Sequence, residues 1–334
     1  MKVLIVANYN PKAGGISGQV TLLHKYLNSE KNVTADIFST KGSAMERLKM
    51  FQTLPEVMRH YDVIHVHGCS YLGFFPVVLA VECAKKLGKR VVCTYHGGGA
   101  GKFFSTYKWI VRHYLSRTNA NIVLSCFLAK IFDKHKIPYT IIPNIIRTEE
   151  NVYRERKMLS PKFISIRTLD PLYNIECIIK AFAILKPKYP DATLDILADG
   201  PSRQKLMDLV RELGLSDITF IGRVHNSEIY NYLDKADIFL STPHIDNQPM
   251  SVLEAFKCGL LVISTNVGGV PYLVEDNKTG LLINDDDHQE LADKMEWALA
   301  HQEQALKMAE AGHGKLSEYT WDAIRSKIHD AYCK

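Results

Sequence analysis

Two acidic residues, Asp246 and Glu254, lie eight positions apart in the stretch DNQPMSVLEAFKCG, and their spacing suits ligand binding. Pro249 fits the first position of a helix because its missing N–H needs no partner there, and Asp246 or Asn247 could cap that helix. The unpaired N–H groups of a helix N-terminus bind phosphate. Carboxylates accept hydrogen bonds from the paired hydroxyls of sugars and ribose. The stretch therefore predicts a diphosphate flanked by two polyols, as in a nucleotide sugar; an ordinary capped surface helix is the alternative.

A second candidate is the glycine pair Gly14 and Gly15, which follows the first apolar segment of the chain. Paired glycines let the backbone approach a phosphate or sugar closely, and the helix expected after them supplies N–H donors. The spacing lacks the GxGxxG fingerprint, so NAD binding is not expected. A plain tight turn is the alternative.

The elements that must position these residues follow from short apolar, β-branched runs that alternate with segments of helical period. The first six runs are residues 3–7, 33–38, 63–67, 90–95, 121–125 and 139–143. After a polar, charged linker, six more follow at residues 162–166, 193–198, 218–222, 237–241, 261–265 and 280–284. This alternation predicts an α/β class with two doubly wound, Rossmann-like domains. Ligands of such sheets bind at the C-terminal ends of the strands, which predicts a cleft between the domains.

Length and composition agree with two domains and exclude several classes of protein. The chain has 334 residues, and 46% of them are hydrophobic. No window reaches the roughly 18 uncharged apolar residues of a membrane span. The first eight residues resemble a buried strand more than a secretory signal, so a cytoplasmic protein is expected. Seven scattered cysteines indicate reduced thiols and argue against a disulfide framework or a cysteine-bound zinc.

The charge is unevenly distributed along the chain. Residues 1–148 hold 20 Lys and Arg against 7 Asp and Glu, a net charge of +13, which leaves 21 against 29, or −8, for the remainder. Such a basic half attracts nucleic acid, an anionic membrane or an acidic substrate. No nucleic-acid module is recognisable, which favours a membrane or an anionic acceptor over nucleic acid; ordinary variation between domains is the alternative. The basic, aromatic run 102–115 predicts either a surface that meets lipid or simple core packing.

Taken together, these motifs resemble the retaining GT-B glycosyltransferases, specifically glycosyltransferase family 4. The resemblance runs from end to end of the chain. It rests on GGISGQV, DVIHVHG (62–68), TYHGGG (94–99), IIPN (141–144), LADGPSRQKL (197–206), FIGRV (220–224), ADIFLSTPHIDNQPMSVLEAFKCGLLVIST (236–265), VGGVPYLVEDNKTGLLI (267–283) and YTWDAI (319–324).

The resemblance implies a GT-B architecture in which residues 1–148 bind the acceptor and residues 149–319 bind the donor. A C-terminal helix at about 320–334 is expected to return to the first domain. The implied activity is metal-independent, retaining transfer of a sugar from a nucleoside diphosphate sugar, UDP-sugar before GDP-sugar, to a hydroxyl. The expected acceptor is a glycan or lipid-linked saccharide of cell-surface polysaccharide synthesis, met at the inner face of the membrane. A GT-B sugar-nucleotide epimerase and a non-catalytic sugar-nucleotide-binding subunit remain alternatives.

Residue roles also follow from the resemblance. Glu254 should accept the ribose hydroxyls, and Asp246 should face the transferred sugar. His96 matches a position near the reacting sugar; a packed histidine at a strand end is the alternative. Main-chain groups complete the implied donor site: the N–H groups of Met250, Ser251 and Val252 for the diphosphate, and the backbone of Val224 for the base.

Two departures from the family pattern affect this donor site. The first acid is usually Glu, whereas Asp246 is one methylene shorter and Asn247 stands where glycine is common. The usual Arg and Lys that hold the diphosphate are also altered. Arg167 remains the candidate for the first cation, and Arg203 or Lys205 could supply the second charge.

Two constellations that could suggest a metal are interpreted as structural. His65 and His67 share one strand face but have no evident third ligand. The acids Asp285, Asp286 and Asp287 follow a strand and precede a helix, where carboxylates cap the N-terminus. No metal and no cofactor are therefore expected.

Overall fold

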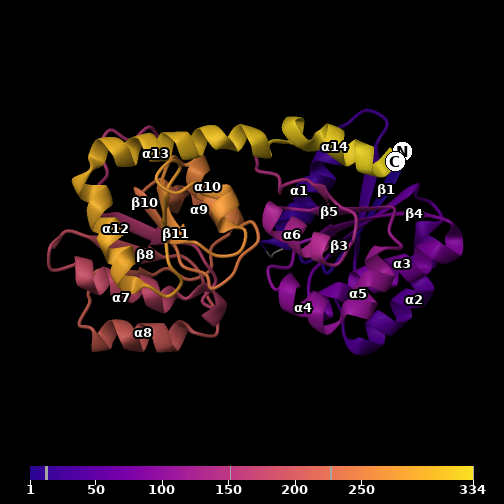
Figure 1. Cartoon of the computed structure of the whole chain (residues 1–334), viewed down its shortest axis with the longest axis horizontal. Helices are drawn as coiled ribbons and strands as arrows, with labels where there is room; N and C mark the ends of the chain where they lie inside the picture. The colour runs from indigo at the N-terminus through magenta and orange to yellow at the C-terminus, as the bar shows by residue number, and fades with distance from the viewer. Residues whose placement is uncertain (12–13, 151, 226–227, 334) are drawn as a thin grey trace. The chain divides into compact units, whose positions relative to one another are not determined.

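The structure is a computed structural model of the chain, and it describes residues 1–11, 14–150, 152–225 and 228–333. It divides into two compact units. Unit 1 comprises Met1–Arg147 and Tyr319–Lys334, and unit 2 comprises Thr148–Glu318. Unit 1 contains the indigo and magenta part of the chain together with the yellow C-terminal helix α14 (Trp321–Cys333) (Figure 1). Each unit contains a parallel six-stranded sheet, so the predicted α/β class is confirmed.

The strands of unit 1 follow the order β2-β1-β3-β4-β5-β6. They are β1 (Lys2–Ala7), β2 (Thr34–Ser39), β3 (Val63–Gly68), β4 (Arg90–Tyr95), β5 (Ala120–Val123) and β6 (Thr140–Ile141). Its helices besides α14 are α1 (Ile16–Asn28), α2 (Ala44–Met58), η1 (Tyr71–Phe74), α3 (Phe75–Leu87), α4 (Ala100–Thr106), α5 (Lys108–Leu115) and α6 (Cys126–Lys134). Because β2 lies on one side of β1 and β3 on the other, the topological switch point lies between β1 and β3.

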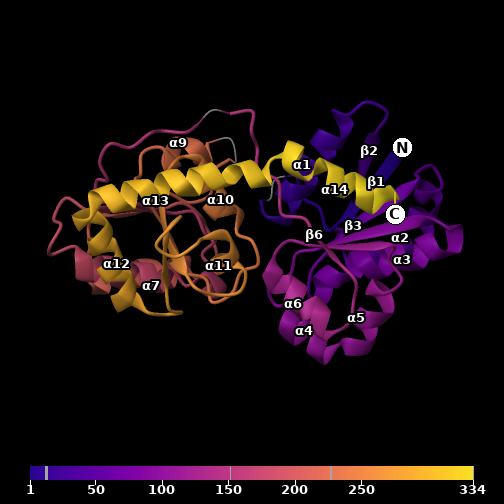
Figure 2. The same cartoon turned by 45° about the horizontal axis from the view of Figure 1, so that its top comes forward.

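Alternate residues of β1 supply two separate cores, as the two-residue period of a strand requires. Val3 and Ile5 pack with residues of α1 and α14, whereas Leu4 and Val6 pack with residues of the helices α2 to α6. Figure 2 shows α1 and α14 beside the same sheet. The C-terminal helix therefore belongs to the core of unit 1, although it follows all of unit 2 in the sequence.

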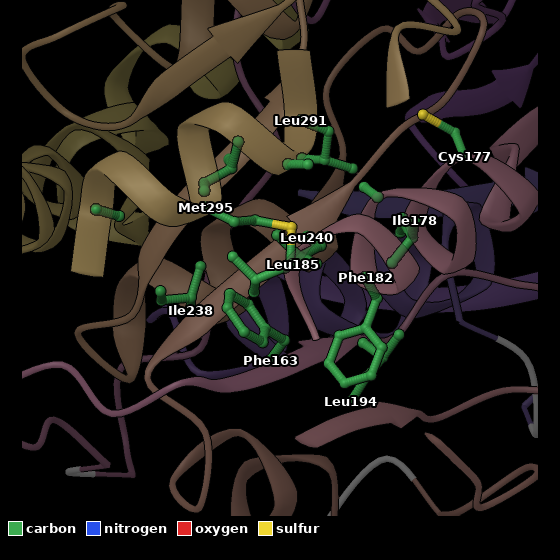
Figure 3. Close-up of a cluster of buried hydrophobic side chains, with 14 of the residues drawn as sticks. Phe163, Cys177, Ile178, Phe182, Leu185, Leu194, Ile238, Leu240, Leu291 and Met295 are labelled. Atoms are coloured by element: carbon green, nitrogen blue, oxygen red, sulfur yellow. The ribbon is translucent and has the colours of Figure 1, made fainter. Parts of the chain in front are cut away.

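The strands of unit 2 follow the order β12-β11-β10-β7-β8-β9. They are β7 (Lys162–Ser165), β8 (Thr193–Ile196), β9 (Ile218–Phe220), β10 (Ile238–Ser241), β11 (Leu261–Thr265) and β12 (Leu281–Ile283). The helices are η2 (Pro171–Tyr173), α7 (Ile175–Leu185), α8 (Arg203–Glu212), α9 (Ile229–Leu233), α10 (Met250–Lys257), α11 (Val270–Leu273), α12 (His288–Ala300), α13 (Gln302–Gly314) and η3 (Lys315–Tyr319). Figure 3 shows one core of this unit, in which Phe163 of β7, Phe182 of α7 and Met295 of α12 share one cluster.

Two local expectations differ from the structure. The helix expected to start at Pro249 starts at Met250; Pro249 is its N-cap, and neither Asp246 nor Asn247 caps it. The reason is the backbone of Pro249, whose ψ of 116° is extended rather than helical. Helix α13, which was not predicted from the sequence, lies between α12 and the predicted C-terminal helix. Among the residues that the structure describes, no helix is long and apolar enough to cross a membrane.

Candidate functional site

The switch point of unit 2 lies between β7 and β10, because the chain proceeds from β7 to β8 and β9 on one side and from β10 to β11 and β12 on the other. Loops that leave two such strands diverge and open a ligand site at their C-terminal ends. Arg167 follows β7, and Asp246 lies in the loop after β10. The topology thus brings together two of the residues expected to contact the donor, although they are 79 positions apart.

Arg167 joins three segments at this point. Its Nη2 donates to Asp246 Oδ2 in an ion pair, and its Nη1 donates to Ser251 Oγ at 2.7 Å. Its guanidinium lies over the ring of Tyr173, with Cζ 4.2 Å from the centroid, in a cation–π contact. Only 8% of Arg167 is exposed. Tyr173 was not singled out from the sequence, and its ring supports the guanidinium.

The carboxylate of Asp246 has a fixed orientation. Its Oδ1 accepts the N–H of Asn247 at 2.7 Å, while Oδ2 accepts Arg167. A carboxylate offers about four acceptor sites, so about two remain for hydroxyl groups of a ligand. Asp246 can therefore bind a sugar hydroxyl while it keeps its ion pair.

The loop that carries Asp246 is held by two glycines that the sequence did not single out, Gly268 and Gly269. The N–H of Gly269 donates to the carbonyl of Asp246 at 2.8 Å. A Cβ at Gly269 would lie 1.7 Å from the carbonyl oxygen of Asn247, and one at Gly268 would lie 2.1 Å from that of Asp246. Gly268 also has a φ of +54°, which favours glycine. These glycines were visible in the motif VGGVPYLVEDNKTGLLI, but their partner loop was not.

Helix α10 presents the other predicted donor contacts. Ser251 follows the first helical residue, Met250, and its hydroxyl faces Arg167. The N–H of Val252 donates to the carbonyl of Pro249 at 3.2 Å, so it is used within the first turn. Glu254 lies in the second turn and is half-buried, on a helix whose other residues from 251 to 257 are buried. The helix thus has its polar end at the switch point and one carboxylate further along.

Arg203 and Lys205, the candidates for a second cation, lie on the other side of β7 at the start of α8. Arg203 Nη2 donates to the carbonyl of Phe220 at 3.4 Å, beside the segment that leads to the half-buried Val224. Lys205 pairs with Glu176 at 2.7 Å, and Lys180 and Lys205 together lower the pKa of Glu176 to about 2. Lys205 is therefore engaged in a surface ion pair, whereas Arg203 stands beside the expected base-binding segment.

Of the three consecutive acids after β12, Asp287 caps the next helix as expected, whereas Asp285 and Asp286 contact other side chains. Asp287 caps α12 by accepting the N–H of Glu290 at 2.8 Å. Asp286 accepts Asn174 Nδ2 at 2.8 Å, and Asp285 pairs with His244 at 2.8 Å.

In unit 1, the buried His65 and His67 of β3 form a row with the half-buried His96, which follows β4. His65 and His67 share one face of β3, with ring centroids 4.6 Å apart, and His67 Nδ1 lies 2.9 Å from His96 Nε2. His65 contacts Tyr332 of α14 through Nδ1 and Thr94 through Nε2, each at 2.7 Å. The three rings line a cavity of about 30 Å³ within unit 1. In the described part of the chain, no three His, Cys, Asp or Glu side chains form a group that could hold a metal.

This histidine row makes the stability of unit 1 sensitive to acid. Burial lowers the pKa of His65 to about 3 and that of His96 to about 4, and it lowers the pKa of His67 well below 6.5. The histidines of the unfolded chain take up protons near pH 6.5, whereas those of the folded chain do so only at lower pH. The free energy of unfolding therefore keeps its full value above pH 6.5 and falls as the pH drops from about 6.5 toward 4. The loss is at most about 1.4 kcal/mol per histidine and pH unit. We expect a lower melting temperature at pH 5 than at pH 7.5, and a smaller difference in His65→Asn. The exposed His60, replaced by Asn, is the matched control; an unchanged difference in His65→Asn would contradict the prediction.

The predicted glycine pair lies at the switch point of unit 1, between β1 and α1. Gly15 is the N-cap of α1 and has a φ of +57°, a conformation that favours glycine. A Cβ at Gly14 or Gly15 would meet none of the described atoms within 4 Å, so the space beside this turn is open.

Comparisons with known proteins agree with this arrangement. The family model described as Glycosyl transferases group 1 matches residues 147–315, and that of Glycosyltransferase Family 4 matches residues 25–150. An uncharacterised glycosyltransferase of Bacillus subtilis, YqgM, is 25% identical over 95% of this chain and 92% of its own length. A GDP-mannose-dependent phosphatidylinositol monomannoside mannosyltransferase of Mycobacterium tuberculosis is 28% identical over 51% of this chain and 46% of its own length.

Among solved structures, HepE of Anabaena in complex with UDP has a TM-score of 0.79 at 16% identity and covers 99% of both chains. This likeness over the full chain shows the shared GT-B fold. Together with the family match to residues 147–315, it establishes that the chain belongs to the Glycosyl transferases group 1 family and is a glycosyltransferase of the GT-B type.

Proposed function

We propose that the protein transfers a sugar, with retention of configuration and without a metal, from a nucleoside diphosphate sugar to a hydroxyl of a glycan or lipid-linked saccharide. The observation that carries this proposal is the contact of Arg167 with both Asp246 and Ser251 at the switch point of unit 2. A cation, a sugar-binding carboxylate and a helix N-terminus meet there. That combination suits a diphosphate with a sugar at one end.

Each group then has a role. Arg167 and the first turn of α10 stabilise the negative charge of the leaving diphosphate, the kind of electrostatic stabilisation that metal ions provide in other transferases. Asp246 accepts hydroxyls of the transferred sugar, and Glu254 accepts those of the ribose. Arg203 and Val224 border the base. In unit 1, His96, Gly14 and Gly15 are assigned to sugar binding.

The bond changes of the proposed reaction involve no enzyme-bound intermediate. The bond between the anomeric carbon and the diphosphate oxygen breaks while the acceptor oxygen bonds to the same face of that carbon. The proton of the acceptor hydroxyl passes to the leaving phosphate. The protein orients both substrates and excludes water, which would otherwise hydrolyse the donor.

The base of the donor is the first point to test. We expect UDP-sugars to raise the melting temperature of the protein more than GDP-, ADP- or dTDP-sugars, because a ligand that binds only the folded state stabilises it in proportion to its affinity. The UDP bound to HepE supports this order, and the GDP-mannose of the mycobacterial relative makes GDP-sugars the main competitor. The same stabilisation in EDTA supports a site without metal; its loss in EDTA refutes that part of the proposal.

Product analysis tests the reaction itself. With a donor of the preferred base and added glycan acceptors, the proposal requires a product whose new linkage has the anomeric configuration of the donor, as NMR would show. Isomerised donor in the absence of acceptor indicates an epimerase. Binding without turnover across acceptors and lipid-linked saccharides indicates a non-catalytic subunit. An inverted linkage contradicts the retaining mechanism alone.

A further inference from the structure

Unit 1 exposes an unusual number of large apolar side chains on one group of neighbouring elements. On α2 they are Met45, Leu48 and Phe51, on η1 Tyr71 and Leu72, and around α5 Tyr107, Trp109 and Ile110. Trp109 is 82% exposed and Leu72 is 79% exposed. Residues that could pack into a core are thus held in solvent, and we call these eight side chains the apolar surface.

Ring contacts link the elements that carry the apolar surface. Phe51 of α2 lies 6.0 Å from Phe75, the residue that follows η1. The ring centroid of Tyr71 of η1 lies 5.2 Å from that of Phe103 and 6.2 Å from that of Tyr107, which precedes α5. Residues of α2, η1, α3, α4 and α5 contribute to one core on the same face of the sheet. The eight exposed residues therefore lie on elements that neighbour one another in unit 1.

The charged residues in the segment of α4 and α5, which carries the exposed Tyr107 and Trp109, are all positive. Residues 100–117 contain Lys102, Lys108, Arg112 and Arg117 and no Asp or Glu. Lys102, Lys108 and Arg112 are exposed, whereas Arg117 pairs with Glu82 at 2.9 Å. On α2, the carboxylate of Glu46 accepts the backbone N–H of Ser43, and Lys49 lies one turn further along the helix. Exposed Trp and Tyr beside Lys and Arg are typical of surfaces that enter the headgroup region of an anionic membrane.

We infer that the apolar surface docks unit 1 on a bilayer that contains anionic lipids. Lysine favours this partner over a protein, because protein interfaces are depleted in Lys whereas each Lys or Arg near an anionic leaflet strengthens binding. Trp109 and Ile110 enter the headgroup boundary, and Lys102, Lys108 and Arg112 contact the phosphates. The inference deepens the proposed function, because a unit 1 that is docked on the membrane lies where a lipid-linked acceptor presents its saccharide. It does not depend on the donor site.

Vesicle binding of the full chain, without any donor, tests the inference. We expect cosedimentation with vesicles of phosphatidylglycerol and phosphatidylcholine but not with phosphatidylcholine alone, and weaker binding as salt rises. Binding should shift the emission of Trp109 to the blue. Trp321, only 8% exposed in the core of unit 1, should contribute little to that shift.

Matched variants separate this surface from net charge. Lys102→Gln with Lys108→Gln should weaken vesicle binding about tenfold or more, whereas Lys278→Gln with Lys307→Gln removes the same charge from exposed lysines of unit 2 and should leave binding nearly unchanged. Trp109→Ser should abolish the blue shift, with Met158→Ser as its control on an exposed apolar residue. Equal binding to neutral vesicles, equal effects of both lysine pairs, or a dimer in solution that Trp109→Ser dissociates would each overturn the inference. Failure of sugar transfer would not affect it.

Discussion

Replacing Arg167 with alanine is expected to lower kcat for sugar transfer by about 10²- to 10³-fold, the loss typical when one preorganised donor to a developing negative charge is removed. The arginine contacts Asp246 and Ser251 together and lies on the ring of Tyr173, so its guanidinium is held before the donor arrives. Arg167→Lys keeps the charge but has no planar fork to reach both partners, and it should recover only part of the rate. Steady-state kinetics with the preferred donor provide the measurement.

A loss of folding could imitate this result, because removing one partner of a buried ion pair leaves the other charge uncompensated, at a cost of about 3–5 kcal/mol. The double variant with Arg167→Ala and Asp246→Ala removes both charges, so its melting temperature should recover toward that of the wild type. Its activity should stay at least as low as that of Arg167→Ala, and Glu254→Ala should also lose transfer. A double variant that is stable and still transfers sugar would refute the roles assigned to Arg167 and Asp246.

The fold could be predicted from the sequence because its signals are local. Each of the twelve apolar runs overlaps a strand. Strands of a parallel sheet are buried on both faces, so a short run of β-branched residues is enough to identify them. The cap at Asp287 is local for the same reason. The order of the strands is not local, and it was not predicted from the sequence.

The contacts within the site could not be predicted in this way. Arg167 and Asp246 pair because β7 and β10 are neighbours in the sheet, which no spacing along the chain reveals. The start of α10 was misplaced by one residue because the backbone of Pro249 is extended, which the residue type alone does not reveal. The contact of His65 with Tyr332 likewise depends on a helix that returns from the far end of the sequence. Such contacts need the tertiary structure, and they fix the geometry of the site.

Gly269→Ala is expected to abolish donor binding although residue 269 is not expected to touch the donor. Its Cβ would lie 1.7 Å from the carbonyl oxygen of Asn247, far inside any real contact. The obstacle is main chain, which cannot rotate away, so the loop that carries Asp246 must move by more than about 1 Å. A misplacement of about 1 Å costs on the order of 10²-fold in rate. Thermal shift with the preferred donor should show no stabilisation, and kcat/KM should fall by at least that factor.

The chain offers controls that separate the clash from ordinary glycine effects. Gly214 has a φ of +64° with no described atom within 4 Å of a Cβ, so Gly214→Ala carries the backbone cost, about 1–2 kcal/mol, without a clash. Gly269 has a φ of −93°, so its alanine carries the clash without that cost. Gly268→Ala combines both. If the Asp246 loop forms the donor site, Gly214→Ala melts earlier but keeps its donor-induced shift, whereas the alanines at 268 and 269 lose the shift. A Gly269→Ala protein that binds the donor as tightly as the wild type would locate the donor elsewhere, because that loop cannot keep its position beside the added methyl group.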